Sequence, residues 1–199
     1  FKGLKKAHKK QGNKAGSGSD NIIAYARLAM LESGKSPLSI LNKKSTSTNK
    51  RNSDKLFIEK IQLKIASGDK ESVAKAIETY ANQPQKSEAV LSYAKGLNLF
   101  SDGKMKQAFI QMKKAGKGKN TVPGANEIAT LMQKDLTKES QINKFIKKAD
   151  KINTPFVTFQ LARNLLKNGH AQKAADQYNK LLWNSPLVTN PIQLLLERA

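Results

Sequence analysis

The sequence predicts an all-α fold made of a row of about five helical hairpins. Polar turns recur at spacings of 34, 35, 34 and 32 residues, at Gly34, Gly68, Gly103, Thr137 and Gly169. A constant period of this size is typical of stacked supersecondary units, which form a solenoid. Apolar residues on both sides of the turns recur at helical spacing, and no run alternates with period two, so we expect no strands.

Each predicted hairpin places one helix before its turn and one after it. In the third hairpin the apolar positions are Val90, Tyr93, Leu97, Ala108, Met112 and Ala115. In the fifth they are Phe159, Ala162, Leu165, Ala174, Tyr178 and Leu181. Pro84 and Pro186 follow the second helices of their hairpins, where a residue that cannot continue a helix is expected.

The composition divides the 199 residues into a central array and two ends. The array covers residues 20–186. Residues 1–19 contain six lysines and no acid, which fits either a basic tail or the end of an upstream repeat. Residues 187–199 fit a capping helix or the start of a further repeat. Within the array, the polar residues 44–53 and the Gly/Pro-rich residues 115–125 indicate exposed loops.

Small residues occupy matching places in the third and fifth hairpins. Gly96, Ala108 and Ala115 in the third correspond to Ala162, Ala174 and Pro186 in the fifth, with Tyr178 as a packing aromatic. In these residues and in its period the chain resembles the tetratricopeptide repeat family. In residues 92–94, 112–114 and 157–160 it more distantly resembles the pentatricopeptide repeat family. The first resemblance implies a right-handed superhelical solenoid that binds protein partners.

Several functional classes are not expected. The chain has no Cys, which excludes disulfides, thiolate metal sites and a cysteine nucleophile. The absence of Cys fits either a reducing or an oxidising compartment. No apolar run reaches the roughly 18–20 residues that span a bilayer. His8 and His170 have no acidic cluster near them, and no nucleophile–base pattern is visible, so we expect no metal, no cofactor and no catalysis.

The resemblance to tetratricopeptide repeats also implies where a partner would bind. In that family the first helices form a concave wall that holds a peptide or helix. The matching residues here are Tyr25, Ile58, Gln62, Tyr93, Leu97, Phe159 and Arg163. The alternative for these residues, Leu97 and Phe159 above all, is that they fill the core between helices.

The charge is strongly basic. The formal net charge is +21, from 36 Lys and Arg against 15 Asp and Glu. Several lysines gather in two short segments and form a candidate basic patch, Lys113, Lys114, Lys144, Lys147, Lys148 and Lys151. The last four recur at helical spacing opposite an apolar stripe, so they share one face of a helix. A charge of this size favours an acidic partner, either protein or nucleic acid.

We therefore expect a non-enzymatic scaffold or adaptor that mediates protein–protein interactions within a larger assembly and has a basic surface for an acidic partner. The alternative is an RNA-binding protein of the pentatricopeptide kind or a ribonucleoprotein component. The base-reading positions of that family correspond to Ala26, Glu59, Ala94 and Gln160. Two of these cannot hydrogen-bond a base and one is anionic, which argues against sequence-specific reading.

Overall fold

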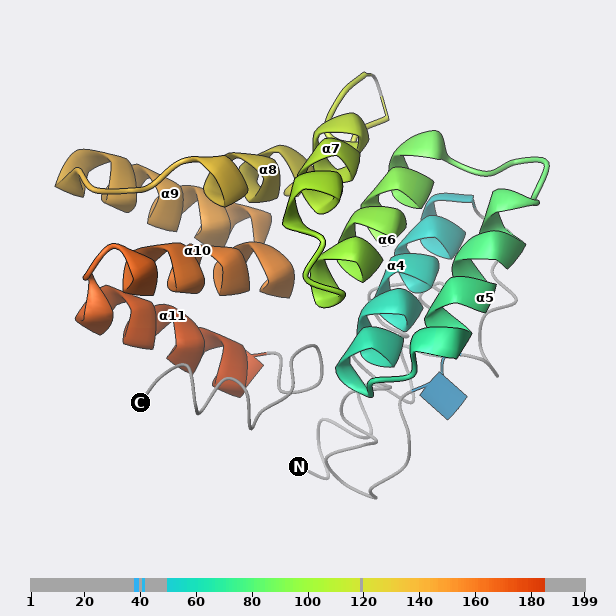
Figure 1. The fold of residues 1–199 in the computed structure, drawn as a ribbon, viewed down its shortest axis with the longest axis horizontal. Helices are drawn as coiled ribbons and strands as arrows, with labels where there is room; N and C mark the ends of the chain where they lie inside the picture. The colour runs from blue at the N-terminus through green and yellow to red at the C-terminus, as the bar shows by residue number, and fades with distance from the viewer. Residues whose placement is uncertain (1–37, 40, 42–49, 119, 185–199) are drawn as a thin grey trace, which may run out of the picture. The chain divides into compact units, whose positions relative to one another are not determined.

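The computed structural model describes residues 38–39, 41, 50–118 and 120–184. Every regular element labelled in these ranges is an α-helix, so the predicted all-α class is confirmed (Figure 1). The helices are α4 (Lys50–Ala66), α5 (Lys70–Ala81), α6 (Glu88–Ser101), α7 (Met105–Ala115), α8 (Ala125–Gln133), α9 (Glu139–Ile152), α10 (Pro155–Lys167) and α11 (Ala171–Asn184). The chain divides into two compact units, Phe1–Leu63 and Lys64–Ala199. Helices α5 to α11 all belong to the second.

The predicted turns lie between helices. Gly68, Gly103 and Gly169 have φ angles of 74°, 73° and 80°, a left-handed conformation that glycine adopts without a steric penalty. Thr137 lies in the connection between α8 and α9. The turn predicted at Gly34 lies outside the described residues.

Two of the predicted hairpins in the second unit, α6–α7 and α10–α11, pack most closely. In α6–α7, Gly96 faces Met112 so closely that an added Cβ would lie 3.0 Å from the Met112 Cε. The small residues Ala108, Ala162 and Ala174 are buried. Small side chains at these places therefore allow the paired helices to approach each other.

The fourth hairpin differs from its neighbours. Helix α8 has only nine residues and packs on α7 and α10, while α9 packs on α10. Helices α8 and α9 contact each other much less than α6 and α7 do. Gly124 begins α8 with φ 87°, and an added Cβ there would lie 2.6 Å from Val157 Cγ2, so only glycine fits. A regular superhelix of five equal hairpins, and its handedness, stay predictions.

A loop joins α7, which ends at Ala115, to α8, which begins at Ala125, as expected, but Gly116, Val122 and Gly124 within it are buried and not exposed. The loop expected at residues 44–53 is wrong for its last four, because Lys50–Ser53 form the first turn of α4. Lys and Arg are good helix formers, so a polar segment can extend a helix whose later residues are apolar. Residues 1–19 and 187–199 lie outside the described part. No helix in the described ranges is both long and apolar enough to span a membrane.

Candidate binding site

A pocket of about 290 Å³ opens between the first helices of the third, fourth and fifth predicted hairpins. Its walls come from α6, α8 and α10, with one residue from the start of α7 and one from the loop after α8. The lining residues are Phe100, Met105, Leu131, Met132, Asp135, Gln160, Arg163, Asn164 and Lys167. One of them, Arg163, belongs to the partner-binding wall predicted from the sequence.

Asn164 fixes the wall that α8 contributes. Its side chain is buried, donates to the carbonyl oxygens of Leu131 at 2.9 Å and Lys134 at 2.8 Å, and accepts from the Leu136 amide at 3.1 Å. These backbone groups lie at the C-terminal end of α8, where a helix leaves carbonyls without partners. Asn164 therefore ends α8 and holds the following loop on α10.

Aromatic rings surround the guanidinium group of Arg163. Its centre lies 5.6 Å from the ring centroid of Phe100 and 5.7 Å from that of Phe159. Phe156 joins the two rings, with centroids 5.1 Å from Phe100 and 6.3 Å from Phe159. Cation–π contacts of this kind favour a fixed, partly desolvated cation. The pocket thus combines apolar side chains from α6, α7 and α8 with a polar wall from α10 that includes the Arg163 guanidinium group.

An ion pair lies at the edge of the pocket. Lys167 Nζ donates to Asp135 Oδ1 at 2.8 Å, and this hydrogen bond lowers the pKa of the Asp135 carboxyl below its ordinary value. Both side chains are well exposed, so the pair contributes little to stability. Met105 is 44% exposed beside it. Methionine side chains are flexible and polarisable, and they adapt to apolar groups of different shape.

The structure places the other predicted wall residues in different surroundings. Tyr93, Leu97 and Phe159 are buried, which agrees with the alternative that they fill the core. Burial also raises the pKa of the Tyr93 hydroxyl. In α4, Gln62 is buried and Ile58 is half-buried. Tyr25 lies outside the described residues. Of the predicted wall residues that the structure describes, only Arg163 lines the pocket, and the Phe159 ring lies beside its guanidinium group.

The base-reading positions of the alternative function are also buried where they are described. Ala94 is fully buried, and Glu59 and Gln160 are each 6% exposed. The Gln160 Nε2 atom is buried, and no described residue accepts a hydrogen bond from it. Ala26 lies outside the described residues.

The basic patch lies on the second helices α7 and α9. Lys113, Lys114, Lys144, Lys147, Lys148 and Lys151 are all exposed, and Ile142 and Ala149 on the opposite face of α9 are buried, as predicted. Two contacts bring the halves of the patch to the first turn of α8. Asn126 Nδ2 donates to the Gly116 carbonyl at 2.8 Å, and Lys148 Nζ pairs with Glu127 Oε1 at 2.7 Å.

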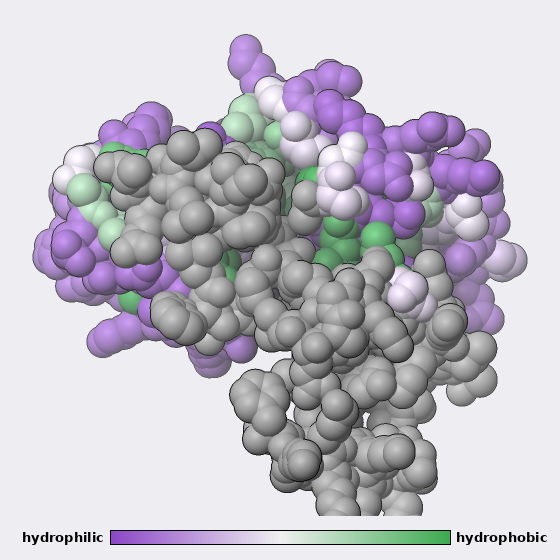
Figure 2. Space-filling view, turned by 90° about the horizontal axis from the view of Figure 1, so that it is seen from below, coloured by the Kyte–Doolittle hydropathy of each residue, from purple (hydrophilic) through white to green (hydrophobic). Residues whose placement is uncertain are grey.

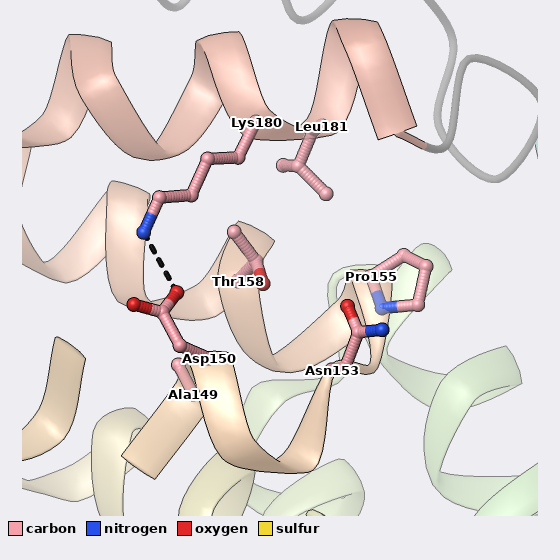
Figure 3. Close-up of a pocket in the computed structure, with 7 residues that line it drawn as sticks. All are labelled: Ala149, Asp150, Asn153, Pro155, Thr158, Lys180 and Leu181. Atoms are coloured by element: carbon pink, nitrogen blue, oxygen red, sulfur yellow. Dashed lines mark hydrogen bonds and ion pairs between the residues drawn. The ribbon is translucent and has the colours of Figure 1, made fainter. Parts of the chain in front are cut away.

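A second pocket, of about 260 Å³, lies between α9, α11 and the start of α10 (Figure 3). Lys180 Nζ and Asp150 Oδ1 form an ion pair of 2.7 Å across it. Asn153, with φ 50°, ends α9 beside it. The two charged groups among the lining residues pair with each other, so the lining carries no net charge.

On the face shown in Figure 2, hydrophilic residues cover most of the described surface, and hydrophobic residues show only in small areas. The large apolar side chains that are well exposed in the described ranges are Met105, Ile110 and Leu166.

Among the residues that the structure describes, no three His, Cys, Asp or Glu side chains are grouped so that they could hold a metal ion. The chain matches no family model, no curated protein and no solved structure.

Sequence reasoning missed every lining residue of the pocket except Arg163, among them Phe100, Met105, Met132 and Asn164. A signal was present for Asn164, because it lies in an otherwise apolar stripe between Leu161 and Leu165. A polar residue on a buried helical face must find hydrogen-bond partners, so it marks a tertiary contact. The other three depend on how α6, α7 and α8 meet, for which the sequence contains no separate signal.

Proposed function

We propose that this chain is a non-enzymatic helical-repeat scaffold that binds a protein partner through the pocket between α6, α8 and α10. The observation that carries the proposal is the arrangement of this pocket. Apolar side chains from three helices surround a cation that two aromatic rings hold in place. Protein interfaces are typically centred on apolar and aromatic contacts with Arg among them, and such groups dominate binding energy.

The chemistry of the pocket favours a particular kind of partner segment. An apolar side chain of the partner would contact Met105 and Met132, whose flexible side chains adapt to groups of different shape. The net charge of +21 would speed the approach of a partner whose binding segment also carries acidic residues.

The substitution Met105→Glu tests the proposal. It places a carboxylate at the pocket, next to Asp135, and we expect it to weaken partner binding at least about tenfold, or about 1.4 kcal/mol. The matched control is Ile110→Glu, which makes the same change at another exposed apolar residue of α7, one that does not line the pocket. Both residues are exposed, so neither variant should unfold.

The measurement is affinity capture from the native source at two salt concentrations, with nuclease treatment in parallel. We expect a stoichiometric protein partner that survives nuclease and is retained by the unaltered chain and by Ile110→Glu, but not by Met105→Glu. Equal recovery with both variants would contradict binding at the pocket. Recovery of nucleic acid alone would contradict the scaffold function.

A further inference from the structure

The lysine surface on α7 and α9 is separate from the pocket, which is lined mainly by first helices. We define this surface by Lys113, Lys114, Lys144, Lys147, Lys148 and Lys151. Figure 1 shows α8 starting beside the end of α7, with α9 running back toward the same place. The contacts of Asn126 with Gly116 and of Lys148 with Glu127 join both helices to the first turn of α8. The end of α7, with Lys113 and Lys114, and the lysine stripe of α9 therefore each lie next to the first turn of α8.

The acids of this region pair with lysines of other elements. Residues 104–152 contain 12 lysines and only 4 acids. The two acids of α9, Glu139 and Asp150, pair with Lys173 and Lys180 of α11. Asp135 pairs with Lys167 of α10. The acids of α9 are thus engaged by α11, on another side of the helix from its lysine stripe.

Three lysines of the stripe consequently have no ion-pair partner among the residues that the structure describes. Of the four on α9, Lys148 pairs with Glu127, whose side chain is 12% exposed. Lys144, Lys147 and Lys151 are exposed, and no described carboxylate lies within 4.0 Å of their amino groups. At 1.5 Å per residue these three span about 10 Å along α9. They form a short row of exposed positive charges along α9.

The composition of the lysine surface indicates which polyanion it fits. Its cations are all Lys, which act as point charges, and residues 52–162 contain no Arg that could bind a base edge bidentately. A protein partner would need an apolar centre, and lysine is depleted from such centres. Ile110 is a single exposed apolar side chain nearby and does not form one.

The aromatic residues of this region distinguish duplex from single strand. Single-stranded nucleic acid binds by stacking its bases on exposed aromatic rings. The two aromatics within residues 104–152, Phe109 and Phe145, are both half-buried, and Lys113 lies over the Phe109 ring. A duplex requires no stacking platform, and it carries one negative charge per about 1.7 Å of its axis.

We propose that the lysine surface binds the phosphate backbone of a nucleic-acid duplex without reading its sequence. The ligand chemistry is the row of backbone phosphates, which DNA and RNA duplexes share. Binding releases condensed counterions as lysines approach phosphates, so affinity should fall steeply with salt. This surface is distinct from the pocket, and its binding does not depend on the proposed scaffold function.

The test compares two triple variants by fluorescence anisotropy. Lys144→Gln, Lys147→Gln and Lys151→Gln together remove the uncompensated row. The control removes three exposed lysines elsewhere in the second unit, Lys75, Lys95 and Lys106, for which no described acid forms an ion pair. Both variants lose the same charge. The probes are DNA and RNA duplexes of about 20 base pairs and of one sequence, a single-stranded DNA, and polyglutamate. Each probe is measured at salt concentrations from about 50 to about 200 mM.

We expect both duplexes to bind the unaltered chain. Loss of the row should weaken binding at least about tenfold at low salt and reduce the slope of log affinity against log salt by about 2–3. The control should change affinity less than about twofold. Equal weakening by both triples would overturn the proposal in favour of diffuse attraction. Tighter binding of the single-stranded DNA than of the duplexes would also overturn the proposal. The same holds if polyglutamate binds through this row of lysines and neither duplex binds. Met105→Glu should leave duplex binding unchanged, which separates this surface from the pocket.

Discussion

At the scale of single residues, Asn164 connects the fold to the candidate site. Its side-chain amide forms hydrogen bonds with three backbone groups at and just after the end of α8. These bonds join α8 to α10, and each of the two helices supplies one wall of the pocket. A buried backbone group that loses its partner costs more than the bond itself contributes, because water cannot replace the partner. The geometry of the pocket therefore depends on a residue that a ligand need not touch.

Replacing Asn164 with Ala should destabilise the protein by about 2–3 kcal/mol, because it leaves the Leu136 amide and two carbonyls without this partner. Urea denaturation measures the change in the free energy of unfolding. The matched control is Asn143→Ala on α9, an exposed asparagine with one 3.3 Å hydrogen bond to Glu139, for which we expect less than about 0.5 kcal/mol. Similar losses in the two variants would contradict the role assigned to Asn164.

The Lys167–Asp135 pair leads to a prediction about pH. The hydrogen bond from Lys167 lowers the pKa of Asp135 below the ordinary value of 3.8. A carboxyl whose pKa is lower in the folded state stabilises the fold above its unfolded pKa and loses that contribution as pH falls through the folded pKa. The pair should therefore contribute at neutral pH, begin to lose this contribution near pH 4, and lose it fully once the pH is below the lowered pKa of the folded state.

Lys167→Gln should raise the pKa of Asp135 toward 3.8 and weaken the dependence of the melting temperature on pH in the acid range. Lys134→Gln, at an exposed lysine one residue before Asp135 and outside the described ion pairs, is the control and should do neither. NMR titration of the Asp135 carboxyl gives the pKa directly. An unchanged pKa in Lys167→Gln would show that the ion pair does not form in solution.

At the scale of elements, the closely packed hairpins depend on small residues at the helix contacts. Gly96 faces Met112 across α6 and α7, and Ala174 of α11 is 1% exposed. The fourth hairpin lacks a close contact of this kind, and its first helix, α8, packs on α7 and α10 instead. This arrangement places α8 between its neighbours and opens the pocket beside it.

Ala174→Leu should destabilise the chain by about 1–3 kcal/mol, because three further carbon atoms would have to fit into a filled contact. Thermal unfolding followed by circular dichroism measures the effect. Ala171→Leu, at the exposed first residue of the same helix, makes the same change without a neighbour to clash with and should shift stability by less than about 0.5 kcal/mol. An unchanged melting temperature in Ala174→Leu would mean that the register of the hairpin is wrong.

At the scale of the whole molecule, the features that depend on local pattern were predictable from the sequence. The turns at Gly68, Gly103 and Gly169 and the amphipathic lysine helix depend on spacing and on left-handed glycines, which are visible in the sequence. The resemblance implied a partner-binding wall that includes Arg163, and only the structure shows that Arg163 lines a pocket. The polar Asn164 in its apolar stripe indicated a tertiary contact, but not which backbone groups it binds. The short α8 and the pairing of the α9 acids with α11 arise from tertiary contacts for which spacing along the chain holds no signal.

The two proposed surfaces share only α7, which contributes Met105 to the pocket and Lys113 and Lys114 to the lysine surface, and they carry different chemistry. The pocket combines apolar side chains with one positioned guanidinium, which suits a protein segment. The lysine surface offers charge without an apolar centre, which suits a phosphate backbone. A scaffold with both properties would hold a protein partner and a nucleic acid at the same time, through groups that can be altered independently.

Binding of a protein partner at the pocket is tested most simply by the paired capture with Met105→Glu and Ile110→Glu after nuclease treatment. We expect one stoichiometric protein to remain bound to the unaltered chain and to Ile110→Glu and to be lost from Met105→Glu. Retention of the same protein by Met105→Glu at the level of the control would contradict the proposed scaffold function of the pocket.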